Sequence, residues 1–174
     1  MNRSSRGTIP FIRLNDVTVE DSQFCIDYLS KVFQKDLDVH LKEEQKAISF
    51  AVKRMCEDSL KWCMALHRFW YSTKLTKETN LPTLAQWYFS YKTFLAAWYS
   101  GYGRYSQEEL YDIGKQCLKS INALIGDKKF LLSNKQPSEV DAIIFGFGIQ
   151  FKYNDVGPLN HYLNSRKKIF DRFF

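Results

Sequence analysis

The spacing of the apolar residues constrains this chain most, because it changes from strand-like to helix-like a short way from the start. The stretch TIPFIRL and the run VTV flank the turn dipeptide Asn15-Asp16, so residues 8–19 predict a β-hairpin. From about residue 24 onward, apolar residues recur mostly at every third or fourth position. Because this is the period of an α-helix, the chain is expected to be mainly α after one short hairpin.

Turn and cap signals divide the helical part into separate helices. Asp21 or Ser22 can cap the first helix, and a long helix is expected from about Lys42 to Tyr71. Pro82 suits the first turn of the next helix, where no hydrogen-bonding N–H is needed. That helix carries an apolar stripe formed by Leu84, Trp87, Tyr88, Tyr91, Leu95 and Trp98. A stripe at helical spacing usually packs into the core, and we expect it to do so here.

Two later helices begin with a capping box, in which a Ser residue and an acidic residue three positions later bind each other's backbone N–H groups. Ser106 and Glu109 form the first such pair, and Ser138 and Asp141 form the second. The second pair precedes the very apolar stretch AIIFGFGI, so the helix that it opens is expected to be central. These four residues are interpreted as structural caps.

Composition narrows the class of protein further. With 45% hydrophobic and 25% charged residues, 8 Gly and 4 Pro, the 174-residue chain has the make-up of one packed domain, or of one domain and part of another. Its 14 Phe, 10 Tyr and 4 Trp residues require an aromatic-rich core or a wide apolar pocket. No apolar stretch reaches the roughly 20 residues that a spanning helix needs, so no transmembrane segment is expected.

The cysteines and histidines form no recognisable metal or redox motif. The four cysteines include no CxxC pair, and we expect reduced thiols. Cys63 and His67 lie four residues apart on one helical face and could form a thiol–imidazole dyad or supply two metal ligands. Because zinc needs three or four ligands and buried cysteine is usually structural, no metal site and no catalytic residue is assigned.

The charge of the chain does not point to nucleic acid. The formal net charge is +6, but most basic residues are mixed with acidic ones along the helices. The exceptions are Arg3, Arg6, Arg13 and the cluster Arg166, Lys167 and Lys168. We therefore expect no nucleic-acid partner. The sequence also contains no P-loop, dinucleotide-binding glycine pattern, HExxH or GxSxG.

A family resemblance enters through the first hairpin and helix. A hairpin entered through Ile9-Pro10, a helix opened by Asp21-Ser22 and a bundle with a capped, buried helix together resemble the glutathione-transferase fold. Three stretches are similar to its failed-axon-connections branch, which is related to the metaxins and to cadmium-responsive proteins. They are IPFIRLNDVTVEDSQFCIDYLSKVFQKDLDVHL, GYGRYSQEELYDIGKQCL and LIGDKKFLLSNKQPSEVDAIIFGFGIQF.

The resemblance implies a mainly α protein in two parts. A glutathione-transferase C-terminal helical bundle would occupy residues 41–174, after a partial thioredoxin-like hairpin and helix over residues 1–35. In the family, two strands and a helix precede the Ile-Pro step, whose proline is cis. Only nine residues precede Pro10, so we expect an incomplete N-terminal half. Such a piece would pack on the bundle, belong to a longer natural chain, or be completed by a partner.

The same resemblance implies candidate site residues. Ile9 and Pro10 would present backbone to glutathione, and Ser22 and the amides beside Asp21 would hold its γ-glutamyl carboxylate. The alternative is that Asp21-Ser22 is only a helix cap and Pro10 only a strand-start proline. A pocket for hydrophobic electrophiles would be lined by Trp87, Tyr91, Phe94 and Trp98. Core packing is the simpler alternative for those four rings.

The expected function is a non-catalytic binding or scaffold role in the cytoplasm, in a stress or cadmium response as the resemblance implies. No bound cofactor is expected. Glutathione or a small hydrophobic molecule is the candidate ligand, and a homodimer or a protein partner is left open. One alternative is an active transferase that conjugates glutathione to hydrophobic electrophiles. Another is a metaxin-like adaptor at the mitochondrial surface, peripherally associated with an organelle membrane.

Overall fold

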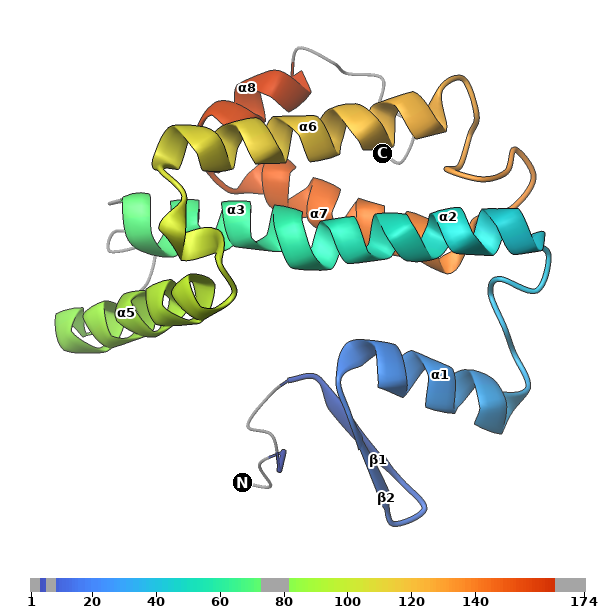
Figure 1. Ribbon diagram of the computed structural model, residues 1–174. Coiled ribbons are helices and arrows are strands. Elements are labelled where there is room, and N and C mark those ends of the chain that lie inside the picture. The colour runs from blue at the N-terminus through green and yellow to red at the C-terminus, as the bar shows by residue number, and fades with distance from the viewer. Residues whose placement is uncertain (1–3, 6–8, 73–81, 165–174) are drawn as a thin grey trace. The chain divides into compact units, whose positions relative to one another are not determined.

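The computed structural model describes residues 4–5, 9–72 and 82–164 of the chain. The chain forms two compact units, Met1–His40 and Leu41–Phe174 (Figure 1). The described strands and one helix belong to the first unit, and the other described helices belong to the second.

The first unit begins with the predicted β-hairpin. Strands β1 (Phe11–Leu14) and β2 (Val17–Glu20) pair antiparallel. Their register is Phe11 with Glu20, Ile12 with Val19, Arg13 with Thr18 and Leu14 with Val17. Asn15 and Asp16 both have positive φ, 49° and 63°, as a tight two-residue hairpin turn requires. The hairpin and its turn dipeptide are therefore confirmed.

Helix α1 (Ser22–Phe33) is held to the hairpin by its first turns. Asp21 is the N-cap, and its side chain accepts a hydrogen bond from the Gln23 N–H at 2.9 Å. The buried thiol of Cys25 donates to the Val19 carbonyl at 3.3 Å. The helix start predicted at Asp21 or Ser22 is thus confirmed, and the thiol ties the helix to β2.

The second unit starts with one helical path from Glu43 to Tyr71. It comprises α2 (Glu43–Arg54), the π-helical η1 (Met55–Leu60), α3 (Lys61–Leu66) and the π-helical η2 (His67–Tyr71). A long helix over these positions was expected and is confirmed. The two wider π-helical turns were not indicated by the apolar spacing, and such turns change which side chains face the core.

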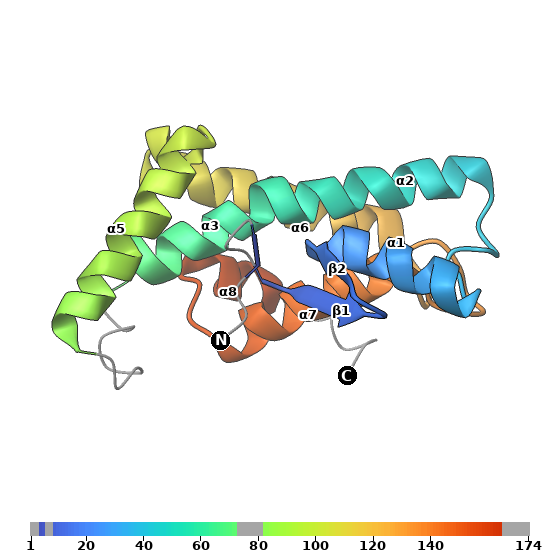
Figure 2. The same cartoon turned by 90° about the horizontal axis from the view of Figure 1, so that it is seen from below.

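Further helices pack on this path to make a bundle. They are α5 (Thr83–Tyr99), the 3₁₀ turn η3 (Tyr102–Arg104), α6 (Gln107–Ile125), α7 (Glu139–Tyr153) and α8 (Pro158–Asn164). Helix α6 packs on η1 and α3, α7 packs on α2, and α8 packs on both α6 and α7. Helix α5 lies at the α3 end of the long helix in both views (Figures 1 and 2) and contacts α3 and η2.

The core of the second unit is formed mainly by η1, α3, α6, α7 and α8 and by the loop before α7. Its largest fully buried side chains are Leu60, Leu66, Leu110, Leu118, Ile125, Leu131, Val140, Ile144, Phe151 and Leu159. Helix α6 approaches its neighbours most closely at Gly114, where a Cβ would lie 2.9 Å from Leu159 and 3.5 Å from Cys63. Glycine at this position therefore allows α8 and α3 to pack against α6.

Helix α5 shows that one sequence-based expectation is wrong. The apolar stripe predicted to face the core faces outward: Leu84 is 78% exposed and Trp87 is 63% exposed. The residues that α5 buries are Gln86 and Ala97. The helix packs through Gln86 and Ala97, with Phe94 partly buried against the core. Its spacing alone could not show which of its two faces meets the bundle.

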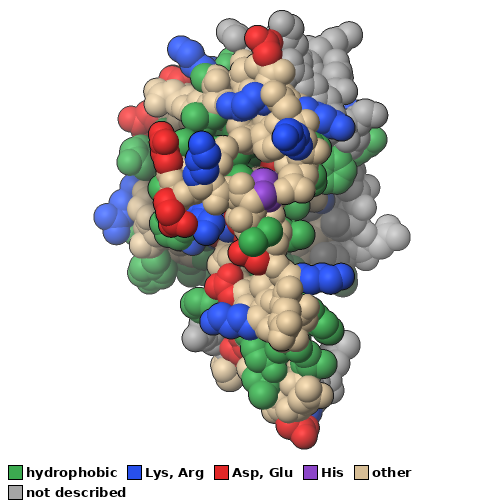
Figure 3. Space-filling view, turned by 90° about the vertical axis from the view of Figure 1, so that its right-hand side faces the viewer, with side chains coloured by type: hydrophobic (Ala, Val, Ile, Leu, Met, Phe, Trp, Pro, Cys, Tyr) green, Lys and Arg blue, Asp and Glu red, His purple; other side chains and the backbone are tan. Residues whose placement is uncertain are grey.

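The fold class is confirmed as mainly helical with a two-stranded antiparallel sheet. On the face drawn in Figure 3, Lys and Arg side chains lie among Asp, Glu and hydrophobic ones. Ion pairs between residues three or four positions apart are part of this mixing: Lys46–Glu43, Arg54–Asp58 and Lys115–Asp112. The expected interspersion of charges on the helices is seen in these pairs.

Candidate functional site

The start of α1 brings together the residues proposed for glutathione. The Ile9–Pro10 peptide bond is cis, as the resemblance implies. The Asp21 N–H donates to the Pro10 carbonyl at 3.2 Å, which places Pro10 beside the residue that caps α1. Ile9, Pro10, Asp21 and Ser22 are all exposed. The four predicted residues thus lie together on the surface of the first unit.

Asp21 holds an unusual backbone conformation at this place. Its φ is 81° and its ψ is 136°, in a region that side-chain-bearing residues rarely adopt. Next to it, the carboxylate of Glu20 accepts hydrogen bonds from the backbone N–H and the hydroxyl of Ser5. A helix start with exposed Ser22 can offer a hydroxyl and N–H groups to an anion, which is the chemistry that a carboxylate ligand requires.

The four rings proposed for a hydrophobic pocket lie on α5 in the second unit. Trp87 and Tyr91 stack on each other, with ring centroids 5.5 Å apart, and both are exposed. Phe94 stacks on Trp70 of η2 at 4.2 Å and tilts against the partly exposed Trp98 at 6.0 Å. The rings therefore form a ladder along one helix, with Phe94 its more buried member.

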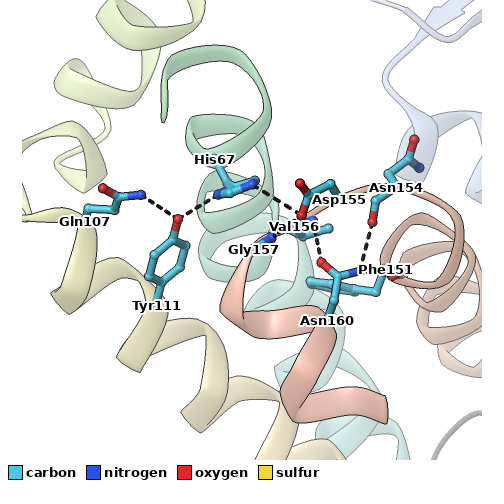
Figure 4. Close-up of polar contacts among 9 residues, drawn as sticks. All are labelled: His67, Gln107, Tyr111, Phe151, Asn154, Asp155, Val156, Gly157 and Asn160. Carbon is cyan, nitrogen blue, oxygen red and sulfur yellow. Dashed lines mark hydrogen bonds and ion pairs between the residues drawn. The ribbon is translucent and has the colours of Figure 1, made fainter. Parts of the chain in front are cut away.

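The suggested Cys63–His67 dyad is replaced by two separate contacts. The Cys63 thiol donates to the Leu110 carbonyl at 3.2 Å. His67 Nδ1 lies 2.7 Å from the hydroxyl of Tyr111 in α6, and Gln107 also donates to that hydroxyl, at 2.6 Å (Figure 4). The thiol and the imidazole each contact α6 at their own position.

His67 also faces the turn between α7 and α8. Its Nε2 lies 3.9 Å from Asp155, whose carboxylate accepts the Gly157 N–H at 2.9 Å (Figure 4). Gly157 has φ +61°, and a Cβ there would lie 2.7 Å from the His67 ring. This packing joins η2, α6 and the turn.

The side chain of Asn160 fixes the same turn from α8. Its amide donates to the carbonyls of Phe151 and Asn154, the latter at 2.9 Å, and its oxygen accepts the Val156 N–H (Figure 4). We interpret the whole cluster as a structural junction between helices. Sequence reasoning missed this cluster, since His67 and Tyr111 are 44 residues apart.

The core thiols are chemically quiet. Burial, and next the negative charge that the neighbouring Cys117 carries when it ionises, raise the pKa of Cys56 and of Cys63 to about 12. Burial also raises the pKa of Cys117. These three side chains therefore stay protonated at neutral pH. Because the thiolate is the form that attacks electrophiles and binds soft metals, they are poor nucleophiles and poor metal ligands.

Both predicted capping boxes are present. Ser106 Oγ accepts the Glu109 N–H at 3.2 Å, and the Glu109 carboxylate accepts the Ser106 N–H at 2.7 Å. Asp141 accepts the Ser138 N–H at 2.8 Å, and its other oxygen accepts the N–H of the buried Leu131 at 2.7 Å. The second box therefore also anchors the loop before α7, which the local sequence did not indicate.

Two features are absent from residues 4–5, 9–72 and 82–164, which the structure describes. There, no three His, Cys, Asp or Glu side chains are grouped so that they could hold a metal ion. Among the same residues, no helix combines the length and the apolar character needed to cross a bilayer.

Two family models match the chain. The glutathione S-transferase N-terminal domain matches residues 1–75, and the glutathione S-transferase C-terminal domain matches residues 114–171. The first match covers the hairpin unit and continues into the helical unit, and the second match lies within the helical unit. Together with the fold, they define the class: the chain belongs to the glutathione S-transferase-like proteins.

Two curated proteins refine this placement. The chain is 29% identical over 185 residues to Failed axon connections of Drosophila melanogaster, with 94% of this chain and 44% of that protein aligned. It is 28% identical over 155 residues to the isoprene-epoxide–glutathione S-transferase of Rhodococcus sp. (strain AD45), covering 82% of this chain and 64% of that enzyme. The chain is thus a relative of Failed axon connections that spans less than two thirds of either protein. No solved structure matches it.

Proposed function

We propose that this chain is a glutathione-binding scaffold related to Failed axon connections, and that conjugation is not its role. The observation that carries the proposal is the juxtaposition at the start of α1, where the Asp21 N–H bonds the Pro10 carbonyl beside the exposed Ser22. In this proposal the backbone at Ile9 pairs with the peptide, as an added strand does. The Ser22 hydroxyl and N–H hold the γ-glutamyl carboxylate.

The backbone of Asp21 supports a binding role for this turn. A residue with φ near 81° outside glycine costs on the order of 1–3 kcal/mol, and such residues cluster at ligand sites. The side chain of Asp21 is engaged as the cap of α1 and is not needed as a ligand group in this proposal. Its task is to aim the next residue, Ser22, outward.

The described thiols do not supply the activating group that conjugation requires. Conjugation requires a group that stabilises the glutathione thiolate, and an activated cysteine has a lowered pKa. Cys56 and Cys63 have the opposite shift, to about 12, and Cys25 is buried with its thiol donating to Val19. The described cysteines are therefore unsuited to that role.

A second candidate function is an active transferase for hydrophobic electrophiles. The likeness to an isoprene-epoxide–glutathione S-transferase favours it, and Trp87, Tyr91, Phe94 and Trp98 are its candidate electrophile-binding residues. A metaxin-like adaptor at the mitochondrial surface, and a part in a stress or cadmium response, are further proposals that rest on the resemblance. The cytoplasm is the proposed compartment for the scaffold role.

Calorimetric titration with glutathione, followed by a conjugation assay with a generic electrophile, tests the proposal. Ser22→Ala should lower the affinity for glutathione about tenfold or more, since hydrogen bonds to a charged carboxylate are strong. The melting temperature should stay constant or rise slightly, because alanine favours the helix. Ser22→Thr, which keeps the hydroxyl, and Asp21→Asn, which keeps a capping oxygen, are the matched controls.

The outcomes separate the candidates. Glutathione binding without turnover, weakened in Ser22→Ala and retained in both controls, supports the scaffold proposal. Conjugation of the electrophile in the same preparation would instead support the active transferase. Absence of binding, or equal binding by wild type and Ser22→Ala, contradicts the site.

A further inference from the structure

Helix α5 turns its more apolar face away from the bundle. We define the aromatic stripe as Leu84, Trp87, Tyr88, Tyr91, Leu95, Trp98 and Tyr99, which share one face at helical spacing. Tyr99 is 81% exposed, and of the seven only Leu95 is less than about two fifths exposed. The buried residues Gln86 and Ala97 lie on the other face. A large outward apolar face of this kind marks an interaction surface.

The rings of the stripe are already ordered. Trp87 stacks on Tyr91, and the Trp70–Phe94 stack continues to Trp98. Because these side chains hold each other in place, little rotamer freedom remains to be lost when a partner covers them. The stripe is therefore a preformed surface and requires no folding on contact.

The charged side chains that the structure places over the rings of the stripe are basic. Helix α5 itself contains no acid. Lys92 lies over the Tyr88 ring at 5.2 Å and Arg104 over the Trp98 ring at 5.6 Å. The stripe is thus apolar, rich in Trp and Tyr, and bordered by cations.

We propose that the aromatic stripe docks on the surface of an anionic lipid bilayer. Trp and Tyr prefer the bilayer–water boundary, where a flat apolar ring and a polar N–H or O–H group are both satisfied. The alkyl stems of Lys92 and Arg104 can lie along the rings while their charges reach anionic headgroups. With no acid on α5, nothing on the helix is repelled by such headgroups. Insertion would be interfacial and would not require a spanning helix.

Charge makes a second copy of the chain and a nucleic acid less suitable partners for the stripe. In a two-fold interface between two copies, both stripes would bring Lys92 and Arg104 to the interface, and α5 offers no acid to pair with them. A nucleic acid needs a row of cations along its phosphates, whereas two border these rings. The inference is independent of the glutathione site, which lies in the other unit.

Vesicle binding by the full chain tests the inference. The probes are vesicles of phosphatidylcholine alone and of phosphatidylcholine mixed with phosphatidylserine, with flotation and tryptophan fluorescence as readouts. Wild type should bind the anionic vesicles with a blue-shifted emission and bind the neutral vesicles more weakly. The double variant Trp87→Ser/Tyr99→Ser should lose about tenfold or more of this binding, because affinity scales with the buried apolar area.

A matched control removes two equally exposed rings elsewhere in the same unit. Phe50 and Tyr153 are 64% and 71% exposed, and Phe50→Ser/Tyr153→Ser should bind vesicles as wild type does. Lys92→Glu should weaken binding to the anionic vesicles about fivefold or more. Circular dichroism should show the same helix content in all variants, since each change is at an exposed position.

Three results would overturn the inference. The first is a wild-type chain that does not bind anionic vesicles. The second is a stripe variant that binds them as well as the control variant does. The third is a wild-type protein that binds no vesicles and forms a dimer in sedimentation equilibrium, with the dimer lost in Trp87→Ser/Tyr99→Ser. That result would show that the stripe binds a second copy of the chain.

Discussion

At the residue scale, Asp141 holds more of the fold together than a helix cap normally does. It is buried, and its carboxylate accepts the N–H of Ser138, the hydroxyl of Ser138 and the N–H of Leu131. Asp141→Ala leaves two buried N–H groups without their acceptor, and each such loss costs on the order of 1–3 kcal/mol. We expect the free energy of unfolding, measured in urea, to fall by about 2–5 kcal/mol.

The exposed capping box of Ser106 and Glu109 supplies the control for Asp141→Ala. Glu109 binds the Ser106 N–H in the same local geometry, but both residues are exposed, so water can replace the lost contact. Glu109→Ala should cost about 1 kcal/mol or less. Equal losses in the two variants would contradict the buried role of Asp141.

Local spacing predicted both boxes because their partners are three residues apart. It could not predict the bond to Leu131, ten residues away, or the contact of His67 with Tyr111 across 44 residues. Contacts of this length depend on how helices pack, and a single sequence carries no local signal for them.

At the scale of elements, three thiols lie where the long helix meets α6. Cys56 and Cys63 come from η1 and α3, Cys117 comes from α6, and burial raises the pKa of all three. For Cys56 and Cys63 the pKa is about 12 in the folded state against an ordinary value of 9.0. Between these values, thiols of the unfolded chain lose protons that the folded chain keeps. Stability should therefore be full below pH 9 and fall as pH rises toward 12.

Urea unfolding at a series of alkaline pH values measures this effect. Each thiol should contribute a slope of up to about 1.4 kcal/mol per pH unit in that window. Cys56→Ala/Cys63→Ala should give a shallower dependence than wild type. If the variant loses stability as steeply as wild type, other groups cause the alkaline unfolding.

Some features of the helices could not be predicted from the spacing of apolar residues. Periodicity and cap signals located the hairpin, the long helix, α5, α6 and α7, because strands and helices differ in their repeats and in how they begin. Periodicity wrongly predicted that the stripe of α5 faces the core. An apolar helix face indicates that it contacts another surface, but not whether that surface is the protein's own core or a partner. The π-helical turns η1 and η2 were missed because the three-and-four spacing continues through them.

At the scale of the whole molecule, the chain is two units with unequal cores. The buried hydrophobic cluster lies between Val52 and Leu163, within the second unit. In the first unit, the described buried hydrophobic residue is Cys25. Local sequence signals predicted a hairpin and a helix here, but the resemblance was needed to interpret them as thioredoxin-like, because so short a segment has too few repeats to define a fold.

This inequality leads to a test of the proposed domains, 1–35 and 41–174. A chain starting at Leu41 keeps every residue of the buried cluster and should unfold cooperatively, with a melting temperature within about 5 °C of the full chain. Residues 1–40 alone should show no cooperative transition, because a two-stranded hairpin with one helix buries too little apolar surface. Thermal melts followed by circular dichroism measure both fragments. A Leu41 fragment that melts without cooperativity would mean that the helical unit needs the hairpin unit to fold, and residues 41–174 would then not be an independent domain.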